Sequence, residues 1–265
     1  MTTSLNCIPC FLRQALEAAK RATADVYVQE EILRYALRMA LEMDWRKPPP
    51  VFGQVFHRQL LRMTGVCDPY RSAKVRFNTM ALAMLPDLSA VVECAPDPLV
   101  MAVQLAIAGN VIDMGVNGNI TEADVRQSVD QALSEVLVGN VEELREEIGR
   151  AKSILYLADN AGEIVFDRLL LERLPVDRTT LVVRGGPVIN DATLVDAQAA
   201  GLDKIVEVVD NGSDAPGTVL SDCSRDFRQR FAQADLIIAK GQGNFETLND
   251  EDANIFFLFK PDNFG

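Results

Sequence analysis

The stretch SILYLADNAGEIVFDRLLLERL, residues 153–174, decides the fold class. Its first six residues form an apolar run as short as a buried strand, and its last twelve show apolar residues at helical spacing. Four more short apolar runs follow, at 179–184, 204–209, 235–239 and 254–259, with helical patterns between them. Strands that alternate with helices predict right-handed βαβ crossovers and a mainly parallel five-stranded sheet covered on both faces.

The half of the chain that precedes residue 153 has a different periodicity. Apolar residues at helical spacing predict helices at residues 9–23, 26–43, 51–64, 69–85, 97–109, 121–135 and 139–150. Pro9 at a first helical position and Thr121 before two acidic residues are typical start signals. We therefore predict an all-α domain over residues 1–150 and an α/β domain over residues 151–265.

Composition and charge exclude several classes of function. The chain has 265 residues and a net charge of −12, which argues against a nucleic-acid partner because phosphate backbones need a basic face. No stretch approaches the roughly 18 apolar residues of a membrane span, and no signal-peptide pattern begins the chain. We therefore predict a cytoplasmic protein. An anionic substrate would need a metal ion and a local lysine in its pocket.

Polar residues follow the predicted strands where each strand ends. In an open parallel sheet, ligands bind beyond the carboxyl ends of the strands, so these residues are the informative ones. They are carboxylates, carboxamides, one lysine and several glycines, at 159–163, 184–191, 210–212 and 240–244. Their convergence on one edge is typical of a metal-phosphate site.

The residue types agree with that chemistry. Oxygen ligands from Asp159, Asn160 and Asp191 would select a hard cation such as Mg²⁺ or Mn²⁺ over zinc. Such an ion leaves positions open for water and for a phosphate oxygen. Lys240 would neutralise the phosphoryl oxygens, and the glycines around residue 242 would let backbone N–H groups approach them.

Each of these motifs also occurs for ordinary structural reasons. Asp-Asn-Ala-Gly after a strand is common as a turn with a helix cap, and Asn190-Asp191 before an amphipathic run is a common N-cap. The GxG at 241–243 is a weak signal and is not the GxGxxG of a dinucleotide site. Only the coincidence of the motifs on one edge favours a functional site.

At these residues the sequence resembles the domain-of-unknown-function-89 family of metal-dependent damage-control phosphatases, in the prokaryotic branch with an N-terminal CxxC. The matching segments are CIPCFLR (7–13), DPYRSAKVRFN (68–78), GNVIDMG (109–115), DNAGEIVFD (159–167), GGPVINDAT (185–193) and KGQGNFETL (240–248). The resemblance spans nearly the whole chain. It implies an all-helical N-terminal domain followed by a Rossmann-like three-layer α/β/α domain. The tail KPDNFG departs from the family pattern.

The resemblance also implies a site. Asp159, Asn160 and Asp191 would be the metal ligands, and Lys240 with the segment after it would lie near the phosphate as part of the catalytic group. Further residues would lie at the substrate, namely Asn110 and Asp113 of the GNxxD segment together with Glu163, Gly241 and Asn244.

The activity implied is hydrolysis of small phosphate esters, such as sugar phosphates and phosphopantetheine-type or damaged metabolites, with Mg²⁺, Mn²⁺, Co²⁺ or Ni²⁺. Attack by a metal-polarised water is favoured over an aspartyl-phosphate at Asp159. A eukaryotic member described as a carboxyl methyltransferase leaves S-adenosylmethionine chemistry as an alternative. A metabolite-binding protein without turnover is the other alternative, and an oligomer remains open.

Cys7 and Cys10 lie at the start of the first predicted helix. A helix N-terminus lowers a thiol pKa, so they form a candidate second metal or redox site, with structural packing as the alternative. A zinc ion would need two more ligands, and the candidates in the helical half are Cys67, Cys94 and His57. His57 itself is expected at the surface or at a boundary.

Overall fold

The structure, a computed structural model, describes residues 2–110, 121–134 and 137–260. It confirms the change from helices to alternating strands and helices near residue 150. The helices that precede the sheet in the described residues are α1 (Cys7–Ala22), α2 (Val26–Leu41), α3 (Pro49–Thr64), α4 (Arg71–Cys94), α5 (Pro98–Ala108), α6 (Glu122–Ser134) and α7 (Val141–Arg150).

The sheet is entirely parallel and has the strand order β3-β2-β1-β4-β5. Its strands are β1 (Ile154–Leu157), β2 (Thr179–Val183), β3 (Glu207–Asp210), β4 (Leu236–Lys240) and β5 (Ile255–Leu258). The chain builds outward from β1 to β3 and then returns to the other side of β1 with β4. The loops after β1 and β4 therefore lie at the switch point where open parallel sheets bind ligands.

Helices cover both faces of the sheet, as predicted. They are α8 (Glu163–Leu171), α9 (Leu194–Ala199), α10 (Arg225–Gln233) and α11 (Gly241–Leu248), with short 3-10 turns at Val176–Arg178 and Leu202–Lys204. Side chains alternate between the faces along each strand. Tyr156 and Ile238 pack with α8, while Leu155 and Ile237 pack with Phe227 of α10.

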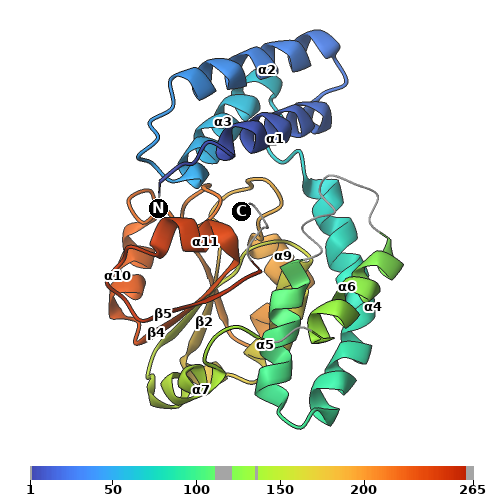
Figure 1. The fold of residues 1–265 in the computed structure, drawn as a ribbon, viewed down its shortest axis with the longest axis vertical. Coiled ribbons are helices and arrows are strands. Elements are labelled where there is room, and N and C mark those ends of the chain that lie inside the picture. The colour runs from blue at the N-terminus through green and yellow to red at the C-terminus, as the bar shows by residue number, and fades with distance from the viewer. Residues whose placement is uncertain (1, 111–120, 135–136, 261–265) are drawn as a thin grey trace.

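The helical half divides into two parts in space (Figure 1). Helices α1, α2 and α3 stack beyond one end of the sheet, whereas α4, α5 and α6 run along its side. One buried core continues from α4 and α5 into α8. The helix-to-sheet change falls between Arg150 and Ile154, and a division into two domains there stays a prediction.

Two elements differ from the sequence-based expectation. Helix α4 continues past Pro86 to Cys94, although a proline removes one helical hydrogen bond; burial of Leu88 and Val92 holds the extra turns in place. Residues 241–244, expected as a loop, form the first turn of α11 directly after β4. In the part of the chain that the structure describes, no helix has both the length and the apolar content that crossing a membrane requires.

Candidate functional site

Two loops meet at the carboxyl edge of the sheet and carry the three predicted metal ligands. Strands β1 and β2 are parallel neighbours, so the loops that follow them leave the sheet at the same edge. Beyond the strands the chain pairs once more, now antiparallel, between Asn160 and Asp191. The Ala192 N–H donates to the Asp159 carbonyl at 2.7 Å. The backbone itself therefore brings Asp159, Asn160 and Asp191 together.

Both carboxylates contact one guanidinium group, that of Arg184 at the end of β2. The Arg184 Nε donates to Asp191 Oδ2 at 2.7 Å, and its Nη2 lies 3.6 Å from Asp159 Oδ1. All three side chains are buried, with Arg184 only 1% exposed. Because a guanidinium is a small rigid plane, the two carboxylates that contact it are close neighbours.

The surroundings of the Asp191 carboxyl shift its pKa. Burial raises its pKa above the ordinary value, and the Arg184 guanidinium opposes the rise. A hydrogen bond from the Gly217 N–H and the charge of Lys74 oppose it further. The surroundings of Asp191 thus supply positive charge that partly offsets its burial, and a bound cation would act in the same direction.

The Asn160 side chain is oriented by two carboxylates. Its Nδ2 donates to Asp159 Oδ2 at 2.8 Å and to Glu163 Oε2 at 3.3 Å. Carboxylates only accept, so the nitrogen of the amide must face them. The amide oxygen is thereby turned to the other side, where it is available as an oxygen ligand.

Lys240 lies under the site rather than at its surface. Its ammonium is fully buried and donates to Glu163 Oε1 at 2.7 Å, to Asp167 Oδ1 at 2.6 Å and to the Ala106 carbonyl at 2.7 Å. An ammonium has three protons, and three protein acceptors use them all. Direct contact between Lys240 and a phosphate stays a prediction; the structure links Lys240 to Asn160 through Glu163.

The Asp167 carboxyl shares this buried network with the Tyr156 hydroxyl, which donates to Asp167 Oδ1 at 2.7 Å. Burial raises the pKa of Asp167 to about 6, against the opposing charge of Lys240. Neither Tyr156 nor Asp167 was predicted from the sequence. A signal was present, because Glu163 and Asp167 are one turn apart on a helix that is otherwise largely apolar.

Asn244 fixes the start of α11 from inside the protein. It is fully buried, and its Nδ2 donates to the Lys240 carbonyl at 2.7 Å and to the Ala158 carbonyl at 3.3 Å. Its Oδ1 accepts the Thr218 hydroxyl at 2.7 Å. A direct contact of Asn244 or of the equally buried Glu163 with the substrate stays a prediction.

Gly241 is the point at which α11 touches the Asp159 side chain. It has φ +77°, and a Cβ added there would lie 1.9 Å from Asp159 Oδ2. We expect Gly241→Ala to displace Asp159 and to lower metal-dependent turnover about 100-fold, since a 1 Å misplacement costs that much. Steady-state kinetics with Mn²⁺ measure this, and circular dichroism checks the fold. Gly149→Ala in α7, whose Cβ would meet nothing within 4 Å, is the control. Parent-like kinetics of Gly241→Ala would contradict the placement.

Helix α4 joins the two ligand-bearing loops. Asn78 accepts the Gly162 N–H at 2.7 Å and donates to Asp196 Oδ1 at 2.9 Å. Lys74, also buried, pairs with Asp196 at 2.8 Å. Asp196 in turn forms a capping box with Thr193 at the start of α9. The segment 68–78 therefore positions both loops, a role that sequence reasoning did not assign to it.

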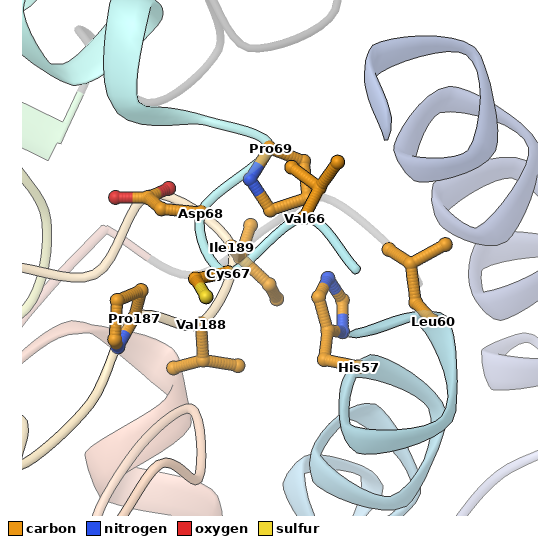
Figure 2. Close-up of a pocket in the computed structure, with 9 residues that line it drawn as sticks. All are labelled: His57, Leu60, Val66, Cys67, Asp68, Pro69, Pro187, Val188 and Ile189. Carbon is orange, nitrogen blue, oxygen red and sulfur yellow. The ribbon is translucent and has the colours of Figure 1, made fainter. Parts of the chain in front are cut away.

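The loop that leads to Asp191 packs on the helical half. Ile189 has φ +42°, an uncommon and strained conformation for a β-branched residue. With Pro187 and Val188 it lines a cavity of about 10 Å³ opposite His57 and Cys67. Figure 2 shows Ile189 between the loop 66–69 and the end of α3. Packing against the helical half thus holds this strained loop in place.

The GNxxD segment lies partly outside the described residues. Asn110 ends the short turn after α5, and Asp113 falls in residues 111–120, which the structure does not describe. A Cβ on Gly109 would lie 3.2 Å from the Glu163 side chain. The described start of the segment is therefore next to the first turn of α8, on the side of the site that Glu163 occupies.

Cys7 and Cys10 lie in the first turn of α1, as predicted. The Ser4 N–H donates to the Cys7 sulfur at 3.4 Å. Within residues 2–110, 121–134 and 137–260, no three His, Cys, Asp or Glu side chains are gathered to hold a metal ion. His57 is half-buried, and it lines the same cavity as Cys67. A redox role of the CxxC pair stays a prediction.

Comparisons with known proteins agree with this architecture. A family model described as the damage-control phosphatase ARMT1-like domain matches residues 3–261. A protein named damage-control phosphatase from Pyrococcus horikoshii is 35% identical over 266 residues, which cover 98% of this chain and 91% of that one. Another of that name, from Archaeoglobus fulgidus, is 36% identical over 255 residues, or 94% and 88% of the two chains.

A solved structure is also similar. The crystal structure of a DUF89 family protein from Pyrococcus horikoshii matches with a TM-score of 0.87 and 33% identity, covering 98% of this chain and 92% of that one. The family model and the relatives each match nearly the full length of the chain. The chain therefore belongs to the damage-control phosphatase ARMT1-like (DUF89) family, and it is a phosphatase enzyme.

Proposed function

We propose that this phosphatase hydrolyses small phosphorylated metabolites at a site where Asp159, Asn160 and Asp191 hold one divalent cation. One observation carries the proposal: the loops after β1 and β2 pair at the carboxyl edge of the sheet and place two buried carboxylates on one guanidinium. Two neighbouring buried carboxylates repel each other, and a cation removes that repulsion.

The donor set fits a hard cation. Two carboxylates and an amide oxygen are the ligands that Mg²⁺ and Mn²⁺ prefer. The Asn160 nitrogen already faces Asp159 and Glu163, which leaves its oxygen for the ion. When bound, the cation would neutralise phosphoryl charge and lower the pKa of a water ligand.

Lys240 serves this site as a positioning residue. It fixes Glu163, Glu163 fixes the Asn160 amide, and Asn160 in turn contacts Asp159. Substituting residues that orient metal ligands in this way commonly lowers metal affinity or activity by about 10–100-fold. Asn78 provides the equivalent support from α4, because it joins the Gly162 backbone to Asp196.

The substrate class we propose is small phosphate monoesters, such as sugar phosphates and phosphopantetheine-type or damaged metabolites. The site lies on the edge of the sheet that α3 spans, where Gln54 and Arg58 bond the loop residues Asp214 and Asp222. A helix and loops that cover this edge favour a small molecule over a polymer as the substrate. We also propose that Asn110 and Asp113 contact the substrate.

A phosphometabolite panel tests the proposal. We expect release of phosphate from sugar phosphates and from p-nitrophenyl phosphate with Mg²⁺, Mn²⁺, Co²⁺ or Ni²⁺, and loss of at least about 99% of that activity with excess EDTA, because the cation supplies several kcal/mol of charge stabilisation. Adding back the metal should restore turnover. Turnover that persists at full rate in EDTA would contradict a metal-dependent mechanism.

A further inference from the structure

One nitrogen of Arg184 has no hydrogen-bond partner among the described residues. Its Nε bonds Asp191 and its Nη1 donates to the Thr218 hydroxyl at 3.4 Å, but the buried Nη2 has no hydrogen-bond acceptor among the described residues. Leaving a buried donor unpaired costs free energy, and the penalty is greater for a charged group. Asp159 Oδ1 lies 3.6 Å from it, beyond hydrogen-bond distance. The site therefore lacks one hydrogen-bond acceptor at Nη2.

The charges of the site are also unbalanced with respect to a divalent cation. Asp159 and Asp191 contribute two negative charges, and Arg184 offsets one of them, so one negative charge remains for an ion of charge two. Of the other buried acids nearby, Asp196 contacts Lys74, while Glu163 and Asp167 share the single charge of Lys240 and lie outside the three predicted ligands. Among the groups that would touch the ion, Arg184 therefore offsets half of the negative charge.

We propose that Arg184 makes the binding of the metal ion and of the phosphate interdependent. The ion binds weakly to the free protein because the guanidinium opposes it, and a phosphate dianion then supplies both the negative charge that Arg184 offsets and an acceptor for Nη2. The inference rests on the function proposed above. It adds that the ion and the phosphate each bind more tightly when the other is bound. Thermodynamic linkage requires the metal to tighten phosphate binding by the same factor.

The parent protein gives the first test. Mn²⁺ binding is measured by the loss of the free-ion electron paramagnetic resonance signal, with and without saturating methylphosphonate, a dianion that cannot be hydrolysed. We expect the dissociation constant for Mn²⁺ to fall at least tenfold with methylphosphonate. Calorimetry should find the same factor for methylphosphonate with and without Mn²⁺. A change of less than twofold would overturn the inference.

Substitutions at Arg184 give the second test. Arg184→Met removes the opposing charge, so Mn²⁺ alone should bind at least fivefold tighter than to the parent, while the coupling to methylphosphonate falls below twofold. Arg184→Lys keeps the charge and should keep most of the coupling. Arg230→Met, which removes an exposed arginine that pairs with Glu207 at the start of β3, away from the site, is the control and should match the parent.

The results for Arg184→Met distinguish a coupling role from a purely structural one. Weaker Mn²⁺ binding with parent-like coupling would show that Arg184 only supports the fold of the site, and would overturn the inference. If this variant does not fold, the coupling measured in the parent protein still tests the inference. Turnover of p-nitrophenyl phosphate by the same preparation separates the two proposals. Metal-dependent turnover without coupling refutes only the role of Arg184, whereas no metal-dependent turnover refutes the proposed function.

Discussion

Asp191→Ala should abolish metal-dependent turnover, with a fall in kcat/KM of at least about 1,000-fold. The substitution removes one of two carboxylates that would hold the cation, and a loss of several kcal/mol of transition-state stabilisation corresponds to that factor. Steady-state kinetics with p-nitrophenyl phosphate and Mn²⁺ measure it. A variant as active as the parent would show that Asp191 is not a ligand.

The same substitution leaves Arg184 buried without its partner, so stability must be measured alongside activity. Removing one partner of a buried ion pair lowers the free energy of unfolding by about 3–5 kcal/mol. Asp191→Ala combined with Arg184→Met removes both charges and should recover most of the unfolding free energy in urea, while turnover stays lost. Recovery of turnover in the double variant would contradict a metal-ligand role for Asp191.

Lys240→Met should cause a large loss of stability, about 3–5 kcal/mol at pH 8. It leaves Glu163 and Asp167 buried without their cation, and both carboxylates are fully inside the protein. Urea unfolding followed by circular dichroism measures the loss. Turnover should fall in the surviving folded fraction as well, because Asn160 loses its support through Glu163.

The loss in Lys240→Met should also depend on pH. The pKa of Asp167 is already raised to about 6 by burial, from an ordinary 3.8, and losing Lys240 raises it further. The folded chain then holds a proton that the unfolded chain releases, so the unfolding free energy falls as the pH rises from about 5 to 8. Adding Glu163→Gln and Asp167→Asn should remove this pH dependence. A deficit that is equal at pH 5.5 and pH 8 would contradict a cost that comes from buried charge.

Much of the fold could be predicted from the sequence. The period change near Ser153 located the switch from helices to strands, and each of the five apolar runs became a parallel strand. Asp159 and Asp191 come after the first and second predicted strands, and this placement predicted that both lie at the carboxyl edge of the sheet. That step depends only on strand ends, which short apolar runs mark well.

The supporting contacts could not be predicted, because they join residues distant in the chain. Asn78 and Asp196 are 118 positions apart, and Lys240 and Glu163 are 77 apart. Helical periodicity does not show which helix packs beside which loop. Arg184 was missed for a different reason: an arginine after a strand is ordinary until its two carboxylate partners are placed around it.

The central claim is that two acids and an amide hold one ion. Anomalous diffraction from a crystal of the protein soaked in Mn²⁺ and methylphosphonate tests this claim most directly. We predict a single strong anomalous peak with oxygens of Asp159, Asn160 and Asp191 within about 2.0–2.6 Å of it. A peak bound elsewhere, for example at Cys7 and Cys10, with none between these three side chains would contradict the site.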